Sequence, residues 1–214
     1  MNSQHLEDRL RWGMNIAARA TGSMTSVFRP SGPDHPLATG NRFLRFLTAF
    51  AAVDGKFNRA NQYGNALWRG IFDSSYTRPG DYLVQDHATW FVAEQPRLMP
   101  TLCVRTNQVI SFFRPATPST SGVNGYGGVT ATSLMPIMTG WPASVLATTR
   151  EGRSFANLPG DTPASVWTVL VPAAPGIILR SADLMSDDLG RNGVIATTEL
   201  TERGWRLVVR QATT

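Results

Sequence analysis

Residues 77–115 alternate short apolar runs with turn signals, and this alternation constrains the fold more than any other feature of the chain. Residues 79–81, Pro-Gly-Asp, predict a turn, because proline fixes one backbone dihedral and glycine accepts the next. Apolar runs follow at residues 82–84 and 90–92, and the residues between them suit a hairpin loop. Residues 101–113 are predicted to form another extended run. The stretch therefore predicts a compact antiparallel β unit with almost no catalytic chemistry in it.

The C-terminal third continues the pattern of short strands at hairpin spacing. The strand candidates are residues 144–149, 165–171, 177–180, 193–199 and 205–211. Turn signals such as Pro175-Gly176 and Glu202-Arg203-Gly204 separate them. Short strands at this spacing predict a small barrel or sandwich.

Residues 116–132 read ATPSTSGVNGYGGVTAT and carry no charge. A segment of this composition buries too little apolar surface to fold alone, so it is predicted to be a linker or an extended arm. The predicted fold class is mainly β with a short N-terminal helix, in two small barrel- or sandwich-like domains joined by this Ser/Thr/Gly linker. The predicted division is a helical arm at 1–22, a first β-rich domain at 23–115, the linker at 116–132 and a C-terminal small β-barrel domain at 133–214.

The first 75 residues predict a helix and leave two segments less defined. Residues 4–19 have an apolar stripe at helical spacing, with acidic residues early and Arg19 late, which suits the helix dipole. Residues 41–53 fit either a short helix or a strand, because their phenylalanines are compatible with both periods. Residues 61–75 are spaced by glycines and are predicted to form an ordered loop held by aromatic side chains.

Aromatic and β-branched side chains in these strands are the candidate core. The core of the first domain is expected to contain Trp68, Tyr82, Trp90 and Phe91. The core of the C-terminal domain is expected to contain Val145, Trp167, Val169, Ile178, Val194, Leu207 and Val209, which alternate with polar neighbours. Trp205 is expected either to cover the end of the barrel or to meet an adjacent subunit.

The charge balance admits contact with nucleic acid but does not require it. The net charge is +5, and all the basic residues except Lys56 are arginines. Arginine binds phosphate in a two-point geometry, yet these arginines are scattered rather than clustered, which also fits codon bias in a GC-rich genome. No apolar run is long enough to predict a transmembrane helix, and the charged N-terminus does not resemble a secretory signal. The single Cys103 excludes an internal disulfide bond.

None of the chemically reactive residues forms a recognisable catalytic, cofactor or metal motif. His5, His35 and His87 lack metal-ligand spacing with one another or with Cys103, which is expected to be a buried, inert thiol. Ser74, Ser144 and Ser165 lack a nucleophile elbow, and the glycines after position 121 lack the Lys-Ser/Thr of a phosphate loop. Asp187 and Asp188 are expected to point outward from the turn, either to solvent or to arginines of a neighbouring subunit, and not to a catalytic metal. The sequence therefore predicts no enzyme, no cofactor and no metal site.

Three stretches resemble structural proteins of the head-to-tail connector of tailed bacteriophages. They are YGNALWRGIFDSSYTRPGDYLV, TWFVAEQPRLMPTLCVRTNQVISFFRP and SADLMSDDLGRNGVIATTELTERGWRLVVRQA. The C-terminal stretch in particular resembles the small β-barrels of head-closure proteins, with a strand, an acidic turn and then a strand ending in Gly-Trp-Arg-Leu. One departure is at residues 191–194, where an aromatic residue often begins the strand after the turn.

The resemblance implies a ring-forming virion component between the portal and the tail, with a central channel for DNA. The implied partners are further copies of the chain, a portal or adaptor protein and tail proteins, with non-specific contact to packaged DNA and no membrane. A tail hub, nozzle or minor tail protein is the alternative within this class. A basic nucleic-acid-binding protein is the alternative from another class, and a hydrolase would need a polar triad that the sequence does not present.

Overall fold

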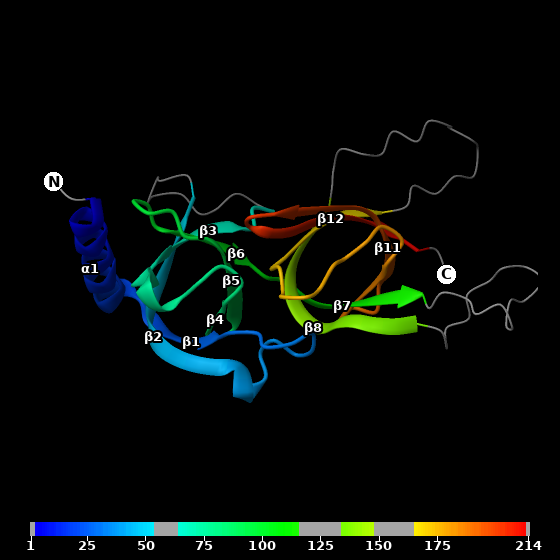
Figure 1. The fold of residues 1–214 in the computed structure, drawn as a ribbon, viewed down its shortest axis with the longest axis horizontal. Helices are drawn as coiled ribbons and strands as arrows, with labels where there is room; N and C mark the ends of the chain where they lie inside the picture. Colours follow the sequence, from blue (N-terminus) through cyan, green and yellow to red (C-terminus); the bar gives the residue numbers. More distant parts are fainter. Residues whose placement is uncertain (1–2, 54–63, 116–133, 148–164, 213–214) are drawn as a thin grey trace, which may run out of the picture.

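Two closed six-stranded β-barrels lie side by side along the long axis of the molecule, with one helix at the far end of the first barrel (Figure 1). The computed structural model describes residues 3–53, 64–115, 134–147 and 165–212. The helix is α1 (Ser3–Thr21). The first barrel contains β1 (Ser23–Phe28), β2 (Arg42–Ala52), β3 (Leu67–Ile71), β4 (Tyr82–Gln85), β5 (Ala88–Glu94) and β6 (Thr101–Arg105). The second contains β7 (Gln108–Pro115), β8 (Leu134–Ala147), β9 (Val166–Val171), β10 (Leu184–Asp187), β11 (Asn192–Thr201) and β12 (Gly204–Gln211).

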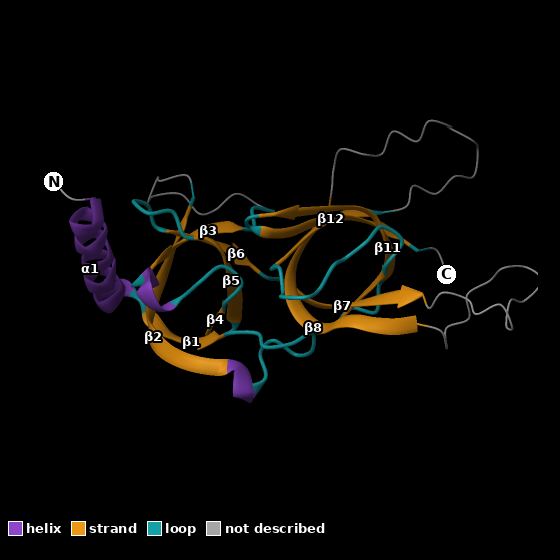
Figure 2. Cartoon of the chain, in the orientation of Figure 1, coloured by secondary structure: helices purple, strands orange, loops and turns teal. Residues whose placement is uncertain are grey.

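The predicted fold class is confirmed: the chain is mainly β, with an N-terminal helix and two small barrels (Figure 2). Helix α1 begins and ends close to the predicted residues 4–19, and the hairpin predicted around residues 85–89 is the β4–β5 hairpin. The ambiguous residues 41–53 form strand β2 rather than a helix. Residues 61–75 were expected to be a loop, but they contain β3, because Leu67 to Ile71 pair with both β2 and β6.

Strand pairing assigns β7 to the second barrel, where it lies between β8 and β10. The predicted boundary after residue 115 places this strand in the first domain, whereas the chain crosses between the barrels at Thr106 and Asn107. A fragment beginning at residue 133 would therefore lack one strand of its barrel. The predicted linker, residues 116–132, lies outside the described residues, and the strands before and after it pair with each other within the second barrel.

The two barrels are repeats of one topology. The order β1-β2-β3-β6-β5-β4 becomes β7-β8-β9-β12-β11-β10 when each strand is replaced by the one six positions later. The registers agree as well, because Phe28 faces Tyr82 in the first barrel as Phe113 faces Leu184 in the second. A register shift occurs just before Phe28 in β1 and just before Phe113 in β7. The chain thus contains the same barrel twice, although the sequence shows no obvious repeat.

Alternation of side chains along the strands gives the first barrel an inner and an outer apolar surface. Val27, Leu83, Trp90, Val92 and Cys103 form the inner cluster. The outward-facing side chains of the same strands, including Tyr82, Phe91 and Val104, belong instead to a core cluster that continues into the second barrel through Trp141, Trp167 and Trp205. The barrels therefore share a hydrophobic core and do not pack as independent domains.

Most of the predicted core residues are buried. Tyr82, Trp90 and Phe91 are buried in the first barrel, and Val145, Trp167, Val169, Leu207 and Val209 are buried in the second. Three of the predicted core residues are not fully buried: Ile178 is 61% exposed, Val194 is half-buried on the outer face of β11, and Trp68 is half-buried against the inner cluster of the first barrel. Ile178 lies in the connection between β9 and β10, outside the regular alternation that would have placed it inward.

Replacing Trp90 with alanine is expected to lower the free energy of unfolding by about 3–5 kcal/mol, because it empties part of the first barrel. The Trp90 ring is stacked on Phe50 with ring centroids 3.9 Å apart, so the loss includes an aromatic contact. Chemical denaturation measures this change. Trp12→Ala is the matched control, since Trp12 is 68% exposed and its removal should leave stability nearly unchanged. Equal effects of the two substitutions would contradict the assignment of Trp90 to the core.

Candidate functional site

The junction between the barrels brings together parts of the chain that are far apart in sequence. It begins at the connection between β6 and β7. The backbone N–H of Thr106 donates to Thr89 O in the first barrel, and that of Asn107 donates to Ala143 O in the second. The Asn107 side chain extends this attachment, since its Nδ2 donates to Val145 O at 2.9 Å and its Oδ1 accepts from Val145 N at 2.8 Å. The connection is therefore fixed by hydrogen bonds on both sides.

Tyr82 joins the two barrels through a buried hydrogen bond. Its Oη donates to the carbonyl oxygen of Pro142 in β8 at 2.7 Å. The Tyr82 ring lies edge-on to Phe91 in its own barrel and to Trp141 in the second, with centroids 6.1 and 6.0 Å away. Complete burial raises the pKa of the phenol well above its usual value, because ionisation would place a charge in the core. Tyr82 therefore acts as a neutral donor and an aromatic contact across the junction.

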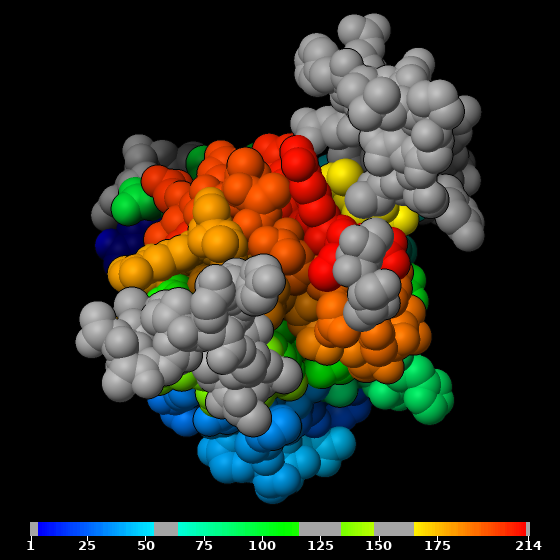
Figure 3. Space-filling view, turned by 90° about the vertical axis from the view of Figure 1, so that its right-hand side faces the viewer, coloured from blue at the N-terminus to red at the C-terminus, as the bar shows by residue number. Residues whose placement is uncertain are grey.

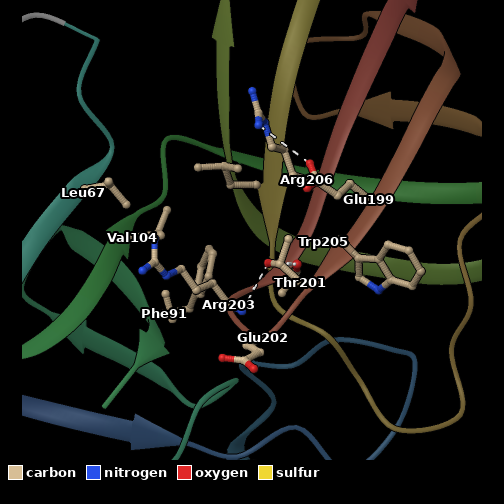
Figure 4. A pocket seen from close by; sticks show the side chains of 12 residues that line it. Leu67, Phe91, Val104, Glu199, Thr201, Glu202, Arg203, Trp205 and Arg206 are labelled. Atoms are coloured by element: carbon tan, nitrogen blue, oxygen red, sulfur yellow. Dashed lines mark hydrogen bonds and ion pairs between the residues drawn. The ribbon is translucent and has the colours of Figure 1, made fainter. Parts of the chain in front are cut away.

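A cavity of about 550 Å³ opens on one side of the junction (Figure 4). The first barrel contributes an apolar wall that includes Leu67, Phe91 and Val104, and the β11–β12 hairpin contributes charged side chains. Arg203 in this hairpin crosses to the first barrel, where its Nε lies 2.7 Å from Oε2 of Glu94. The cavity therefore has an apolar wall from the first barrel and charged side chains from the second barrel at its edge.

A second cavity of about 760 Å³ at the junction has a more polar lining. Asn65, His87 and Arg105 contribute from the first barrel, and Gln108, Ser144 and Asp188 from the second. The Oε1 atom of Gln108 is buried without a hydrogen-bond partner. The lining combines one imidazole, one carboxylate and one guanidinium with amides, which suits binding of polar groups better than a defined reaction.

In each barrel, an arginine at the end of the first strand binds a buried aspartate just before the fourth strand. In the first barrel, Arg29 Nε and Nη2 donate to the two carboxylate oxygens of Asp81 at 2.8 and 2.7 Å. In the second, Arg114 makes the same two-point contact with Asp183 at 2.7 and 2.8 Å. Both aspartates are almost fully buried, and these contacts raise the pKa of both guanidinium groups. The arginines therefore stay charged and neutralise each buried carboxylate.

The surroundings of the two clamps, Arg29–Asp81 and Arg114–Asp183, also correspond. Asp81 accepts from the backbone N–H of Arg78, and Asp183 accepts from that of Arg180, three residues earlier in each case. The residue before each aspartate has a positive φ, 94° at Gly80 and 71° at Ala182. An alanine in this conformation is strained, so the second turn keeps the geometry of the first at some cost.

Sequence reasoning missed both clamps, although the sequence carries a signal for them. Phe-Arg-Pro occurs at residues 28–30 and again at 113–115, and an Arg-x-x-Asp pattern occurs at 78–81 and again at 180–183. The two motifs recur in the same order in each half of the chain. Their recurrence is a weak signal of the duplication, and it falls on the arginine and aspartate of each clamp.

The structure separates the acidic pair that was expected to point outward. Asp188 is exposed, but Asp187 is buried, so the prediction was wrong for Asp187. Its Oδ2 accepts from Arg191 Nε at 2.7 Å, and its Oδ1 accepts from the backbone N–H groups of Leu189 and Arg191. Asp187 therefore holds the β10–β11 turn together. Trp205 is also buried, within the shared core.

The remaining candidate residues are scattered over the fold. His5 is on α1, His35 on the connection between β1 and β2, and His87 in the β4–β5 turn. Cys103 is buried on β6, Ser74 and Ser144 lie on separate elements, and Ser165 directly precedes β9. The glycines after position 121 lie outside the described residues. Among the residues that the structure describes, no cluster of three His, Cys, Asp or Glu side chains is placed to bind a metal ion.

No protein-family model, no curated protein and no solved structure matched the chain. Within the described residues, no helix combines the length and the hydropathy needed to cross a membrane.

Replacing Arg114 with alanine is expected to destabilise the protein by about 3–5 kcal/mol, because it leaves the buried carboxylate of Asp183 without its counter-charge. Arg180→Ala is the matched control: it removes an exposed arginine beside the same clamp and keeps the backbone N–H that contacts Asp183. Denaturant unfolding compares the two variants. If both unfold at the same denaturant concentration as the wild type, the clamp does not hold the barrel closed.

The Cys103 thiol is expected to resist modification in the folded protein. It is fully buried, and burial raises its pKa well above the usual value, so almost no thiolate exists at mildly alkaline pH. A coloured disulfide reagent at pH 8 should therefore react only after denaturant unfolds the chain. Complete reaction of the native protein as fast as that of the denatured protein would show that Cys103 is accessible.

Proposed function

We propose that the chain is a structural virion protein of a tailed bacteriophage, a ring-forming component of the head-to-tail connector through which DNA passes. In this function the chain acts by contact rather than by catalysis. Its partners are further copies of itself, a portal or adaptor protein, and tail proteins. Its place is the junction of head and tail in the virion, after assembly in the host cytoplasm.

The three stretches that resemble connector proteins support this proposal through the strands they form. The first contains β3 and reaches β4, the second contains nearly all of β5 and the whole of β6 and β7, and the third contains β10, β11 and β12. Together they supply most of the strands that meet at the junction between the barrels. The small closed barrels agree with the fold that the resemblance implies for the C-terminal half.

The observation that carries the proposal is the outer surface of α1. Leu6, Trp12 and Ile16 are 46, 68 and 47% exposed, and Trp12 and Ile16 lie one turn apart on the side away from Ala18, which is buried against the barrel. An exposed tryptophan and an exposed isoleucine one turn apart, with Leu6 also exposed nearer the start of the helix, are typical of a protein-contact surface. We assign this surface to the neighbouring portal, adaptor or tail component.

Unpaired arginines support passive contact with DNA. Arg42 and Arg45 on β2 and Arg9 and Arg19 on α1 are exposed, and none of them forms an ion pair with the described residues. Their spread over separate elements suits weak, non-specific attraction to phosphate rather than a defined groove. The alternative of a dedicated nucleic-acid-binding protein calls for a steep dependence of DNA affinity on salt. The other alternative, a tail hub, nozzle or minor tail protein, shares the same contact surfaces.

Purified wild-type protein is expected to form a closed ring, alone or on its portal or tail partner. Light scattering after size exclusion gives the mass, and negative-stain images show the ring. Trp12→Glu should leave self-assembly intact and weaken attachment to the partner at least tenfold, about 1.4 kcal/mol or more. Tyr76→Glu is the control, since Tyr76 is 63% exposed on the connection between β3 and β4.

A wild-type protein that stays monomeric, both alone and with its portal and tail partners, would refute the connector function. Equal loss of attachment in the Trp12 and Tyr76 variants would refute the role assigned to α1.

A further inference from the structure

The two barrels have equivalent corners, and each corner is covered by the element that precedes it in the chain. Helix α1 covers the corner of the first barrel, and the first barrel covers that of the second. The corner is defined by the end of the third strand of a barrel together with the hairpin that joins its fifth and sixth strands. On the first barrel, Leu10 and Met14 of α1 line a crevice with Phe72, Gln95 and Met99. On the second barrel, the wall that contains Leu67, Phe91 and Val104 faces the β11–β12 hairpin and Leu170 near the end of β9.

An ion pair marks each of the two contacts. Arg97, between β5 and β6, reaches back to Glu7 of α1, with Nη1 and Oε1 3.8 Å apart. Arg203, between β11 and β12, reaches back to Glu94 of the first barrel at 2.7 Å. The helix thus occupies, on the first barrel, the place that the first barrel occupies on the second.

The surface with which the first barrel contacts the second is a row of outward side chains that runs across four paired strands. Its members are Tyr82, Phe91, Val104 and Leu67, each directly opposite the next in the sheet. Tyr82, Phe91 and Val104 are at most 3% exposed because the second barrel covers them.

The second barrel carries the corresponding row on β10, β11, β12 and β9. Its members, also directly opposite one another, are Leu184, Val194, Arg210 and Val166. The row keeps its apolar character at every position but Arg210. Leu184, Val194 and Val166 are half-buried and Arg210 is exposed. The second barrel thus presents the docking row of the first. Figure 3, viewed from the side of this barrel, shows the orange and red segment that carries β11 and β12 at the surface.

The corner of the first barrel, which would receive this row from another copy, is covered by α1, and α1 buries few of its own side chains there. Of the helix residues whose side chains the structure describes, Ala18 alone is fully buried, and Leu10 and Met14 are half-buried. The contact between the barrels, in contrast, buries whole aromatic side chains on both sides. A helix held in this way can be displaced by a surface that matches the corner better.

We propose that the Leu184–Val194–Arg210–Val166 row docks on the corner of the first barrel in a second copy of this chain and displaces α1 from it. The proposal rests on the proposed ring assembly and names its subunit interface. The occupant is a second copy because the contact repeats, between chains, the one that already joins the two barrels within a chain. Such an interface uses two different surfaces, so repeating it generates a closed ring or an open filament.

The test compares full-length variants by mass over a range of concentrations. Val194→Asp places a carboxylate in the centre of the row and is expected to raise the concentration needed for assembly at least tenfold. Val109→Asp is the matched control, the same change at an exposed position on β7, outside the row. Leu10→Ala combined with Met14→Ala loosens α1 and is expected to lower the concentration needed for assembly about tenfold. Far-UV circular dichroism verifies that each variant is folded.

The outcomes separate this interface from the proposed function. Rings that form equally well with Val194→Asp and with the wild type would overturn the interface while leaving the connector function intact. Equal loss of assembly with Val194→Asp and Val109→Asp would also overturn it, because the effect would not be specific to the row. Absence of assembly in every protein, including wild type with its partners, would instead overturn the connector function.

Discussion

Packing of one barrel's outer wall against the next barrel is the constraint on which the rest of the structure depends. An outward apolar side chain on a closed barrel is normally exposed to water, so Phe91 and Val104 are acceptable only because the second barrel covers them. The buried hydrogen bond of Tyr82 to Pro142 O then restrains the orientation of the two barrels, since breaking it would leave the phenol donor in the core without a partner. Two repeats of one fold have thereby become a single unit, and neither can be removed without exposing the core of the other.

The two Arg–Asp clamps show what the repeated fold requires locally. Each aspartate lies at the entry to the fourth strand of its barrel, and each arginine lies at the end of the first strand, so the pair joins two neighbouring strands. Buried ion pairs contribute little net stability compared with apolar residues, but they penalise any arrangement that leaves the carboxylate alone. The clamps therefore specify which strands pair and where the first strand ends. Their persistence in both barrels, even with an alanine at positive φ, fits such a role in specifying the fold.

Local patterns revealed the strands but not their assignment to barrels. The apolar runs around Trp90 and Trp167 are short and are bounded by turn signals, which is the pattern of a buried strand, so their burial followed from the sequence. The pattern could not show that β6 and β7, separated by only two residues, belong to different barrels, because that depends on pairing with strands far away in sequence. The segment around Trp68 was predicted to be a loop because of its glycines. Gly70 is nevertheless a strand residue, and it is a glycine because the Phe72 ring and Cys103 lie too close to leave room for a side chain. Asp187 was predicted to point outward because acidic residues in turns are usually exposed to solvent. Its ion pair with Arg191, visible only in the structure, identifies it as a buried structural residue.

The connection between β6 and β7 has a mechanical consequence. Both of its residues donate backbone hydrogen bonds, one to each barrel, and the Asn107 side chain adds two more. These hydrogen bonds restrain the backbone between the barrels, so bending the molecule at this connection requires breaking them and separating the aromatic rings of Tyr82 and Trp141. The two barrels should therefore behave as a single stiff strut. A force applied to α1 would therefore displace the second barrel together with the first, because the molecule does not bend between them.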